Sequence, residues 1–195
     1  MSIARPFVKS ANNAWLHLKT KNLRLVPHRP KDLLALLKGS AEYEKSSGIG
    51  VADGVREFLL AASPDFLAEL KHATGPDRWR FGFAVVHEID NIVIGMCGFA
   101  GPPPEPGGTI EIAYSIGPAY QGKGYATEVA MALVEFALGS GRVATVCAHT
   151  LPDLSASTRV LEKCGFKKIG TLTDSENNLV WRWERSASAS SNRER

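Results

Sequence analysis

The sequence has few cysteines, no long hydrophobic run and almost no excess of one charge. Its three cysteines, Cys97, Cys147 and Cys164, form no CxxC pair and no Cys/His spacing of a metal site, which disfavours a disulfide framework and a metal centre. The apolar stretch at residues 129–138 is interrupted by a glutamate and is too short to cross a bilayer, and residues 1–10 lack the apolar segment of an export signal. We therefore expect a cytoplasmic protein with no metal and no membrane association.

The small net charge is carried by the two ends of the chain. The 23 Lys and Arg residues exceed the 20 Asp and Glu residues by three. Residues 1–10 and 185–195 together contribute +4, which leaves −1 for residues 11–184. A nucleic-acid-binding surface normally shows clustered basic residues, so we expect no nucleic-acid partner.

The composition is that of one folded domain with short ends. Hydrophobic residues make up 44% of the 195 residues, which is too many for a disordered chain and enough for one sizeable core. We assign residues 1–14 to an N-terminal extension and residues 15–184 to a single domain. Residues 185–195 have no apolar anchor and are predicted to form a disordered tail.

The residue pattern predicts alternating strands and helices. Strands are predicted at 16–26, 80–87, 92–99, 109–116, 142–149, 166–173 and 179–183, and helices at 32–38, 57–73, 127–138 and 153–163. Residues 40–56 give a poor signal and are expected to include a mobile loop. This order of elements predicts a mixed α/β sheet with helices on its faces.

The segment from Ile110 to Glu128 reads as a strand, a glycine turn and a helix. Gly122 and Gly124 let the backbone approach a ligand closely, and the helix N-terminus adds partial positive charge, so the turn suits an anion. A plain turn between strand and helix would look the same. Two other phosphate motifs are incomplete here: Gly124 stands where a Walker A loop needs Ser or Thr, and Thr127 stands where a Rossmann turn needs glycine.

Two segments together resemble the GCN5-related N-acetyltransferases (GNAT). Gln121–Ala126 fits the Q/R-x-x-G-x-G/A signature of that family, and Leu151–Phe166 resembles its second signature, closest to the branch of the ribosomal-protein N-terminal acetyltransferases. The similarity spans roughly residues 16–184. It implies a mostly antiparallel central sheet with helices on both faces, in which the strands at 111–116 and 142–149 splay apart.

The resemblance also implies acetyl-CoA as co-substrate and a primary amine, on a protein N-terminus or a small molecule, as acceptor. Related enzymes are monomers or homodimers, and their acceptor pockets involve the first helices, here residues 40–76. The loop backbone would hold the CoA pyrophosphate, and the end of the strand before it would pair with the pantetheine arm. The implied cofactor-binding residues are Tyr114, Ser115, Ile116, Gln121, Gly122, Lys123, Gly124, Tyr125, Ala126 and Thr127. Tyr125 either contacts the phosphates or covers the helix.

Glu111 is the candidate general base for removing a proton from the amine. Along the strand, Glu111, Ala113 and Ser115 share one face, so a lone carboxylate among small residues faces something polar. The alternative is a solvated carboxylate, or one paired with Arg80 or Lys19. The backbone N–H near Ile116 is the candidate oxyanion donor.

The candidate acid is less clear because the chain departs from the family pattern. Many relatives have Tyr at the position of Leu161 and Asn at that of Leu154, which leaves Ser157 as a substitute acid and Asp153 or Ser155 as the helix cap. A thiolate is also a tolerable leaving group without an acid. Because of these departures, a non-catalytic acyl-CoA-binding protein remains an alternative interpretation. A P-loop-like nucleotide binder is a second alternative, which Gly124 disfavours. His149 ends a strand beside the predicted cleft, where a structural or a functional role fits.

Overall fold

One mixed sheet runs through the part of the chain that the structure describes. The computed structural model describes residues 17–101, 105–174 and 177–187. The strands are β1 (Leu18–Lys19), β2 (Leu23–Pro27), β3 (Gly50–Val51), β4 (Phe83–His87), β5 (Ile92–Phe99), β6 (Gly108–Ile116), β7 (Val143–Thr150), β8 (Lys167–Thr173) and β9 (Leu179–Ser186). Within these residues the strand order is β1-β2-β4-β5-β6-β7-β9-β8, with β3 beside β5. Among the described pairs only β6–β7 and β3–β5 are parallel, so the sheet is mostly antiparallel, as predicted.

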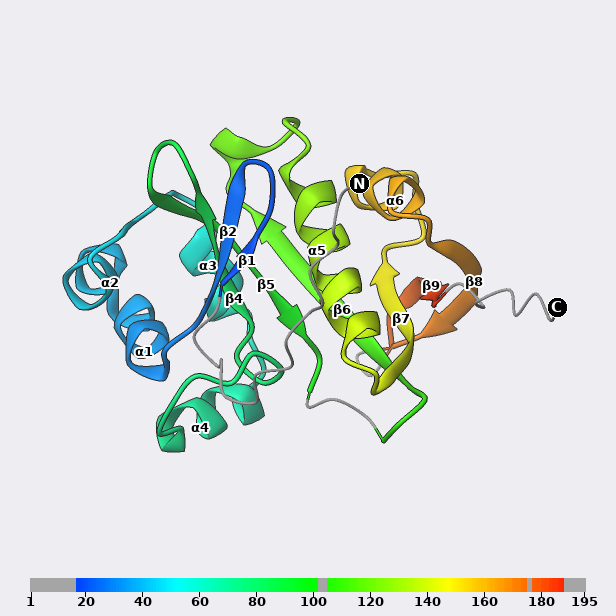
Figure 1. Cartoon of the computed structure of the whole chain (residues 1–195), viewed down its shortest axis with the longest axis horizontal. Helices are drawn as coiled ribbons and strands as arrows, with labels where there is room; N and C mark the ends of the chain where they lie inside the picture. The colour runs from blue at the N-terminus through cyan, green and yellow to red at the C-terminus, as the bar shows by residue number, and fades with distance from the viewer. Residues whose placement is uncertain (1–16, 102–104, 175–176, 188–195) are drawn as a thin grey trace, which may run out of the picture.

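Helices cover both faces of this sheet (Figure 1). They are α1 (Pro30–Lys38), α2 (Ser40–Ser47), α3 (Val55–Leu60), α4 (Pro64–His72), α5 (Tyr125–Gly139) and α6 (Ala156–Lys163). Helices α5 and α6 share one core with Phe83 and Val85, whereas α1, α3 and other residues of the N-terminal helical layer share a second core with Ala84 and Val86. The four consecutive residues of β4 therefore alternate between the two cores, as a strand buried on both faces requires.

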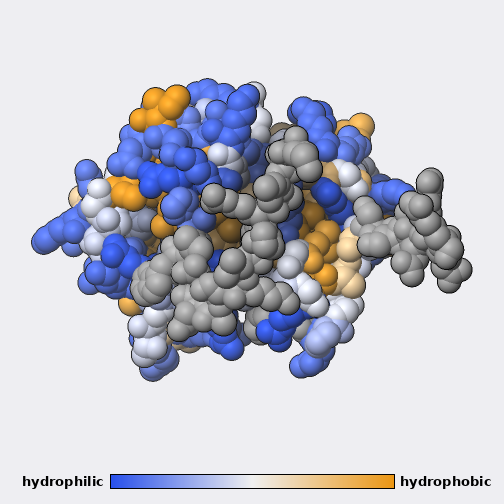
Figure 2. All heavy atoms as spheres, in the orientation of Figure 1, coloured by the Kyte–Doolittle hydropathy of each residue, from blue (hydrophilic) through white to orange (hydrophobic). Residues whose placement is uncertain are grey.

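The central helix α5 forms because its sequence favours helix and has one strongly apolar side. Val129, Leu133 and Ala137 repeat every four residues and are completely buried against the sheet. In the view of Figure 2 the described surface is mostly hydrophilic, and hydrophobic residues show in small separate patches. No helix among the described residues is long and apolar enough to cross a membrane.

The parallel pair in the middle of the sheet is joined at one end only. The register of β6 with β7 runs from Gly108↔Val143 to Glu111↔Cys147 and then stops, although both strands continue. From Ile112 to Ile116, β6 pairs only with β5 among the described strands. The predicted splayed strand pair is therefore present.

The structure corrects several details of the sequence prediction. The helix expected over residues 57–73 is divided into α3 and α4, and Ser63 caps the second of them. Residues 16–26 were expected to form one strand, but a turn at residues 20–22 divides this segment into β1 and β2. Residues 40–56 are not a loop: they contain α2, β3 and the start of α3, and α2 gave no periodic signal because Tyr43 is its only buried residue. Strand β9 extends to Ser186, two residues into the predicted tail, because Arg185 and Ser186 still pair with Val146 and Thr145 of β7. Residues 1–14 and 188–195 lie outside the described residues.

Candidate active site

A cavity of about 530 Å³ lies where β6, the glycine loop and α6 meet. Most residues predicted to bind the cofactor line it, and so does Ser157. The lining residues are Tyr114, Ser115, Ile116, Tyr120, Gln121, Gly122, Gly124, Tyr125, Ala126, Thr127, Ala156, Ser157, Arg159, Val160 and Lys163. The structure thus brings together two segments that lie about 30 residues apart in the chain.

The loop between β6 and α5 presents backbone groups to this cavity. Gly122 and Gly124 have φ of 74° and 86°, in the left-handed region that favours glycine. Gly124 is the N-cap of α5, and no side chain caps the first turn of that helix. The N–H groups of the first turn therefore remain available to an anion. At the start of the loop, the Gln121 side-chain amide donates to the Ile116 carbonyl oxygen at 2.8 Å and so fixes the loop to the end of β6.

Helix α6 contributes two positively charged side chains to the cavity lining, and these were not predicted from the sequence. Arg159 and Lys163 line the cavity from successive turns of that helix. The sequence feature that could have predicted this pair is their spacing of four residues, since it places both side chains on one face of a helix. Lys123, which was predicted to contribute, is absent from the lining, and its ammonium lies 5.1 Å from the ring centre of Tyr120.

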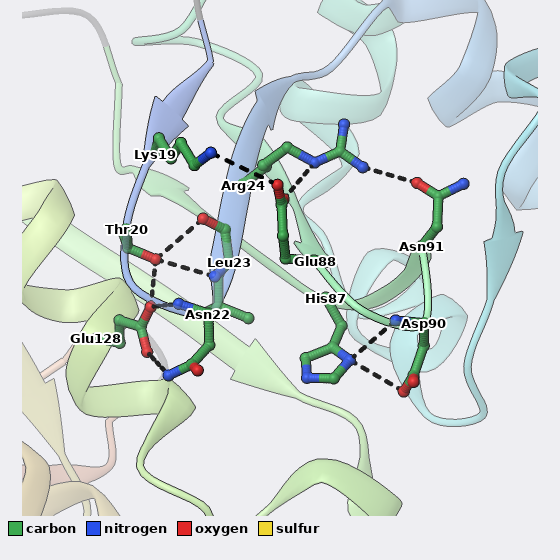
Figure 3. A network of polar contacts seen from close by, with 10 residues as sticks. All are labelled: Lys19, Thr20, Asn22, Leu23, Arg24, His87, Glu88, Asp90, Asn91 and Glu128. Carbon is green, nitrogen blue, oxygen red and sulfur yellow. Dashed lines mark hydrogen bonds and ion pairs between the residues drawn. The ribbon is translucent and has the colours of Figure 1, made fainter.

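A partly buried polar contact ties the start of α5 to the turn between β4 and β5. The Tyr125 hydroxyl lies 2.9 Å from His87 Nε2, and His87 Nδ1 lies 3.0 Å from Asp90 Oδ2. Figure 3 shows His87 pointing toward Asp90. Tyr120 donates to the same carboxylate at 2.8 Å, and this hydrogen bond raises the pKa of Tyr120. The hydroxyl of Tyr125 is thus engaged in holding the loop, while its side chain still lines the cavity.

Glu128, one turn into α5, holds the same helix from the other side (Figure 3). Its carboxylate accepts hydrogen bonds from the Thr20 hydroxyl and from the backbone and side-chain nitrogens of Asn22, the latter two at 2.6 and 2.9 Å. Partial burial alone would raise the pKa of Glu128, but the hydrogen bonds from Asn22 and Thr20 outweigh it and lower the pKa. The turn between β1 and β2 is therefore closed by a residue more than 100 positions away.

Glu111 meets His149 across the junction of β6 and β7. His149 Nδ1 lies 2.8 Å from Glu111 Oε1, and the two side chains are 23% and 36% exposed. Neither predicted alternative partner contacts Glu111: Arg80 pairs with Glu69 and Asp77, and Lys19 lies 3.7 Å from Glu88. Glu111 lies at the last paired position of the two strands, so the carboxylate and the imidazole stand where the strands begin to separate.

A second charged pair lies beside this one on β9. His149 is registered with Arg182, whose Nε lies 2.7 Å from Glu184 Oε1. His149 Nε2 is buried and has no hydrogen-bond partner among the described residues. The imidazole is therefore held by its Nδ1 contact with Glu111.

Comparison with known proteins identifies the family. The acetyltransferase (GNAT) domain model matches residues 22–167. An uncharacterized N-acetyltransferase of Bacillus subtilis (strain 168), YnaD, is 36% identical over 155 residues, which cover 80% of this chain and 85% of the relative. The chain belongs to the GNAT acetyltransferase family. It spans little more than half the length of two other N-acetyltransferase relatives, 52% and 58%.

Solved structures with the GNAT fold superpose on nearly the whole chain. The ribosomal-protein-S5-alanine acetyltransferase from Vibrio fischeri has a TM-score of 0.60 at 14% identity, covering 89% of this chain and 97% of that one. RimL, a ribosomal L7/L12 α-N-protein acetyltransferase in complex with coenzyme A, has a TM-score of 0.60 at 17% identity, covering 88% and 98%. These likenesses confirm the predicted fold and place ribosomal-protein acetyltransferases among its structural neighbours.

In this GNAT domain the two positions that depart from the family pattern lie outside the cavity lining. Leu161 is 1% exposed and packs in the core under α6, whereas Leu154 is 83% exposed in the loop before that helix. Ser155 caps α6 in a capping box with Thr158, which decides between the two predicted caps. Ser157 lines the cavity, on the exposed side of the helix.

The cysteines of the GNAT domain are free and buried. Burial raises the pKa of Cys147, the one registered with Glu111, to about 11. It is therefore protonated at neutral pH and is a poor nucleophile. Within the described residues, no three His, Cys, Asp or Glu side chains are grouped so as to hold a metal ion.

Proposed function

We propose that this GNAT domain transfers the acetyl group of acetyl-CoA to a primary amine by direct attack in a ternary complex. The observation that carries the proposal is the order of three side chains on one face of β6. Ser115 lines the cofactor cavity, Ala113 lies two residues before it, and Glu111 stands two residues earlier still, at the junction with β7 and in contact with His149. At about 3.4 Å per residue, a carboxylate at Glu111 lies within reach of an acceptor placed beside the cavity.

The residues lining the cavity fit the parts of acetyl-CoA. The amides of the loop at Gln121–Ala126 and the first turn of α5 suit the pyrophosphate, and Arg159 and Lys163 add charge for phosphate oxygens. The edge of β6 that β7 leaves unpaired suits the amides of the pantetheine arm, which would lie along it as an added strand does. RimL, a neighbour in fold, has been solved in complex with coenzyme A, which supports this class of ligand.

Glu111 is proposed as the base, and His149 as the residue that positions it. The acceptor arrives mostly as an ammonium, so Glu111 takes a proton directly or through water before the nitrogen attacks the thioester carbonyl. The N–H near Ile116 stabilises the tetrahedral oxyanion. When the intermediate collapses, the C–S bond breaks, the nitrogen gives its remaining extra proton to water, and the CoA thiolate takes up a proton from water either directly or through the hydroxyl of Ser157, which we propose as the acid and which regains its proton from water. Because Cys147 is protonated, an acetyl-cysteine intermediate is disfavoured.

The test is incubation of the protein with acetyl-CoA and a panel of primary amines. Release of free CoA thiol together with an acetylated amine detected by mass spectrometry is the expected result. Tight CoA binding without transfer to any amine would favour the non-catalytic acyl-CoA-binding alternative. Binding of ATP with Mg²⁺ but not of CoA would favour the nucleotide binder and overturn the proposal.

A further inference from the structure

A second, smaller cavity of about 130 Å³ lies on the other side of β6 from the glycine loop. Helices α3 and α4 form its outer wall, and the segment before β4 (residues 80–82) together with strands β5 and β6 forms its inner wall. It is lined by Phe58, Leu59, Ala62, Phe66, Arg80, Phe81, Gly82, Met96, Cys97, Gly98, Phe99 and Ala113. The cofactor cavity and this cavity share no lining residue.

The lining of this pocket is almost entirely apolar. Phe66 and Phe81 meet edge to face, with ring centres 6.0 Å apart, and Phe58 on α3 remains 38% exposed at the rim. Arg80, the charged member of the lining, already pairs with Glu69 and Asp77. The pocket thus offers aromatic and aliphatic contacts and no unpaired charge among its described side chains. It suits an apolar group and offers nothing to a polycation.

The base of the pocket is rigid because two backbones touch there. A Cβ built on Gly98 would lie 2.9 Å from the Cα of Gly82, so a side chain at that position has no room. Ala113, registered with Gly98 across β5 and β6, adds only a methyl group. Side chains of small size therefore leave this space open between the helices and the sheet.

The pocket adjoins the proposed catalytic residues through Ala113. On the same face of β6, Glu111 lies two residues before Ala113 and Ser115 lies two residues after it. Two residues of strand span about 7 Å, which is the length of a side chain. A group held in the pocket would therefore place an amine a few bonds away between Glu111 and the cofactor cavity.

We infer that the acceptor is a primary amine that carries a bulky apolar group, aromatic or branched aliphatic, within a few bonds of the nitrogen, and that this pocket binds that group. The inference rests on the proposed function, since it names the acceptor of that reaction. A polypeptide beginning with a large apolar residue and a small arylalkylamine present the same chemistry.

The experiment compares matched acceptors in the acetyl-CoA thiol-release assay. Leucinamide is paired with glycinamide, phenethylamine with ethanolamine, and a leucine-initiated peptide with its glycine-initiated counterpart; spermidine is the polycationic amine. We expect kcat/KM to be at least about 10-fold higher for the apolar member of each pair. A further gain of the leucine peptide over leucinamide would identify a polypeptide as the source, and its absence a small amine.

Two substitutions on α3 provide the structural control. Phe58→Ser removes part of the pocket wall and is expected to reduce the leucinamide-to-glycinamide ratio about 10-fold, mainly through KM for leucinamide. Leu60→Ser, on the same helix, 49% exposed and outside the pocket, should leave the ratio unchanged. CoA affinity and thermal unfolding, measured on both variants, establish that each is folded.

The possible failures are distinguishable. Transfer to glycinamide or spermidine at least as good as to the apolar amines overturns this inference and leaves the proposed function standing. No transfer to any amine overturns both. A Phe58→Ser variant that changes the sedimentation coefficient, with an unchanged acceptor ratio, would make the pocket a contact between two copies and also overturn the inference.

Discussion

The two cavities beside β6 are built in different ways. The larger one takes most of its lining from residues 114–127, a short stretch that includes the left-handed glycines Gly122 and Gly124. The smaller one is lined by residues of α3, α4, the segment just before β4, β5 and β6, which lie between residues 58 and 113. A site made of backbone depends on a short sequence with fixed glycines, whereas a site made of side chains depends on how distant elements pack. The first therefore suits a ligand common to a family, and the second can change with the acceptor.

The largest effect on activity is expected from a change at Glu111, the proposed base beside the two cavities. Glu111→Gln is expected to reduce kcat for amine acetylation at pH 7 by at least about 100-fold, because the ammonium then has no base. The affinity for CoA, measured by calorimetry, should stay the same, since Glu111 lies outside the cofactor cavity lining. Full activity of this variant would remove Glu111 from the mechanism.

His149 should matter less, because it acts through Glu111. His149→Gln is expected to reduce kcat roughly 10-fold, since a displaced carboxylate is poorly aligned with the amine. The pH profile of kcat should also change shape, because that profile reports the proposed base and His149 is the hydrogen-bond partner of its carboxylate. A loss of thermal stability with an unaltered pH profile would indicate a purely structural role.

The cofactor loop can be tested through its backbone alone. No atom lies within 4 Å of a Cβ built on Gly122, so Gly122→Ala adds no clash, only the strain of its φ of 74°. That strain, about 1 kcal/mol, should weaken CoA binding about fivefold. Gly139→Ala, at the far end of α5 with equal space and no positive φ, is the matched control. Equal affinities of the two variants would contradict a role for the loop conformation.

The smallest expected effect is on stability, at the contact between α5 and the β1–β2 turn. The pKa of Glu128 is lowered from 4.5, so its contribution is present above that pH and is lost as the pH falls through the folded-state value. Glu128→Gln should therefore reduce the free energy of unfolding at pH 7 by less than about 1 kcal/mol, since the group is only partly buried and water screens its interactions. Urea unfolding should show this difference shrinking below pH 4.5. Glu135→Gln, an exposed position on the same helix, should show no such pH dependence.

The features that could be predicted from the sequence are formed by residues close together in the chain. The features that could not be predicted join residues that lie far apart in it. The strand–loop–helix segment at 110–128 was predictable because its glycines, its alternation and its signature lie in one stretch. The contact of Glu111 with His149 was not, because 38 residues separate them and only the β6–β7 register joins them. Helix α2 was missed because a helix with one buried residue has almost no apolar period. The apolar pocket could not be predicted for the same reason as the His149 contact, since its lining residues are spread over positions 58–113 and meet only in the fold.

The incomplete pairing of β6 with β7 has a consequence for the stability of the protein in a cell. A ligand that lies along the unpaired edge from Ile112 to Ile116 binds the folded chain and not the unfolded one. If acetyl-CoA is that ligand, its free concentration adds RT ln(1 + [L]/Kd) to the free energy of unfolding, about 2.7 kcal/mol at 100 times Kd. The lifetime of the protein against proteolysis would then follow the supply of its own co-substrate.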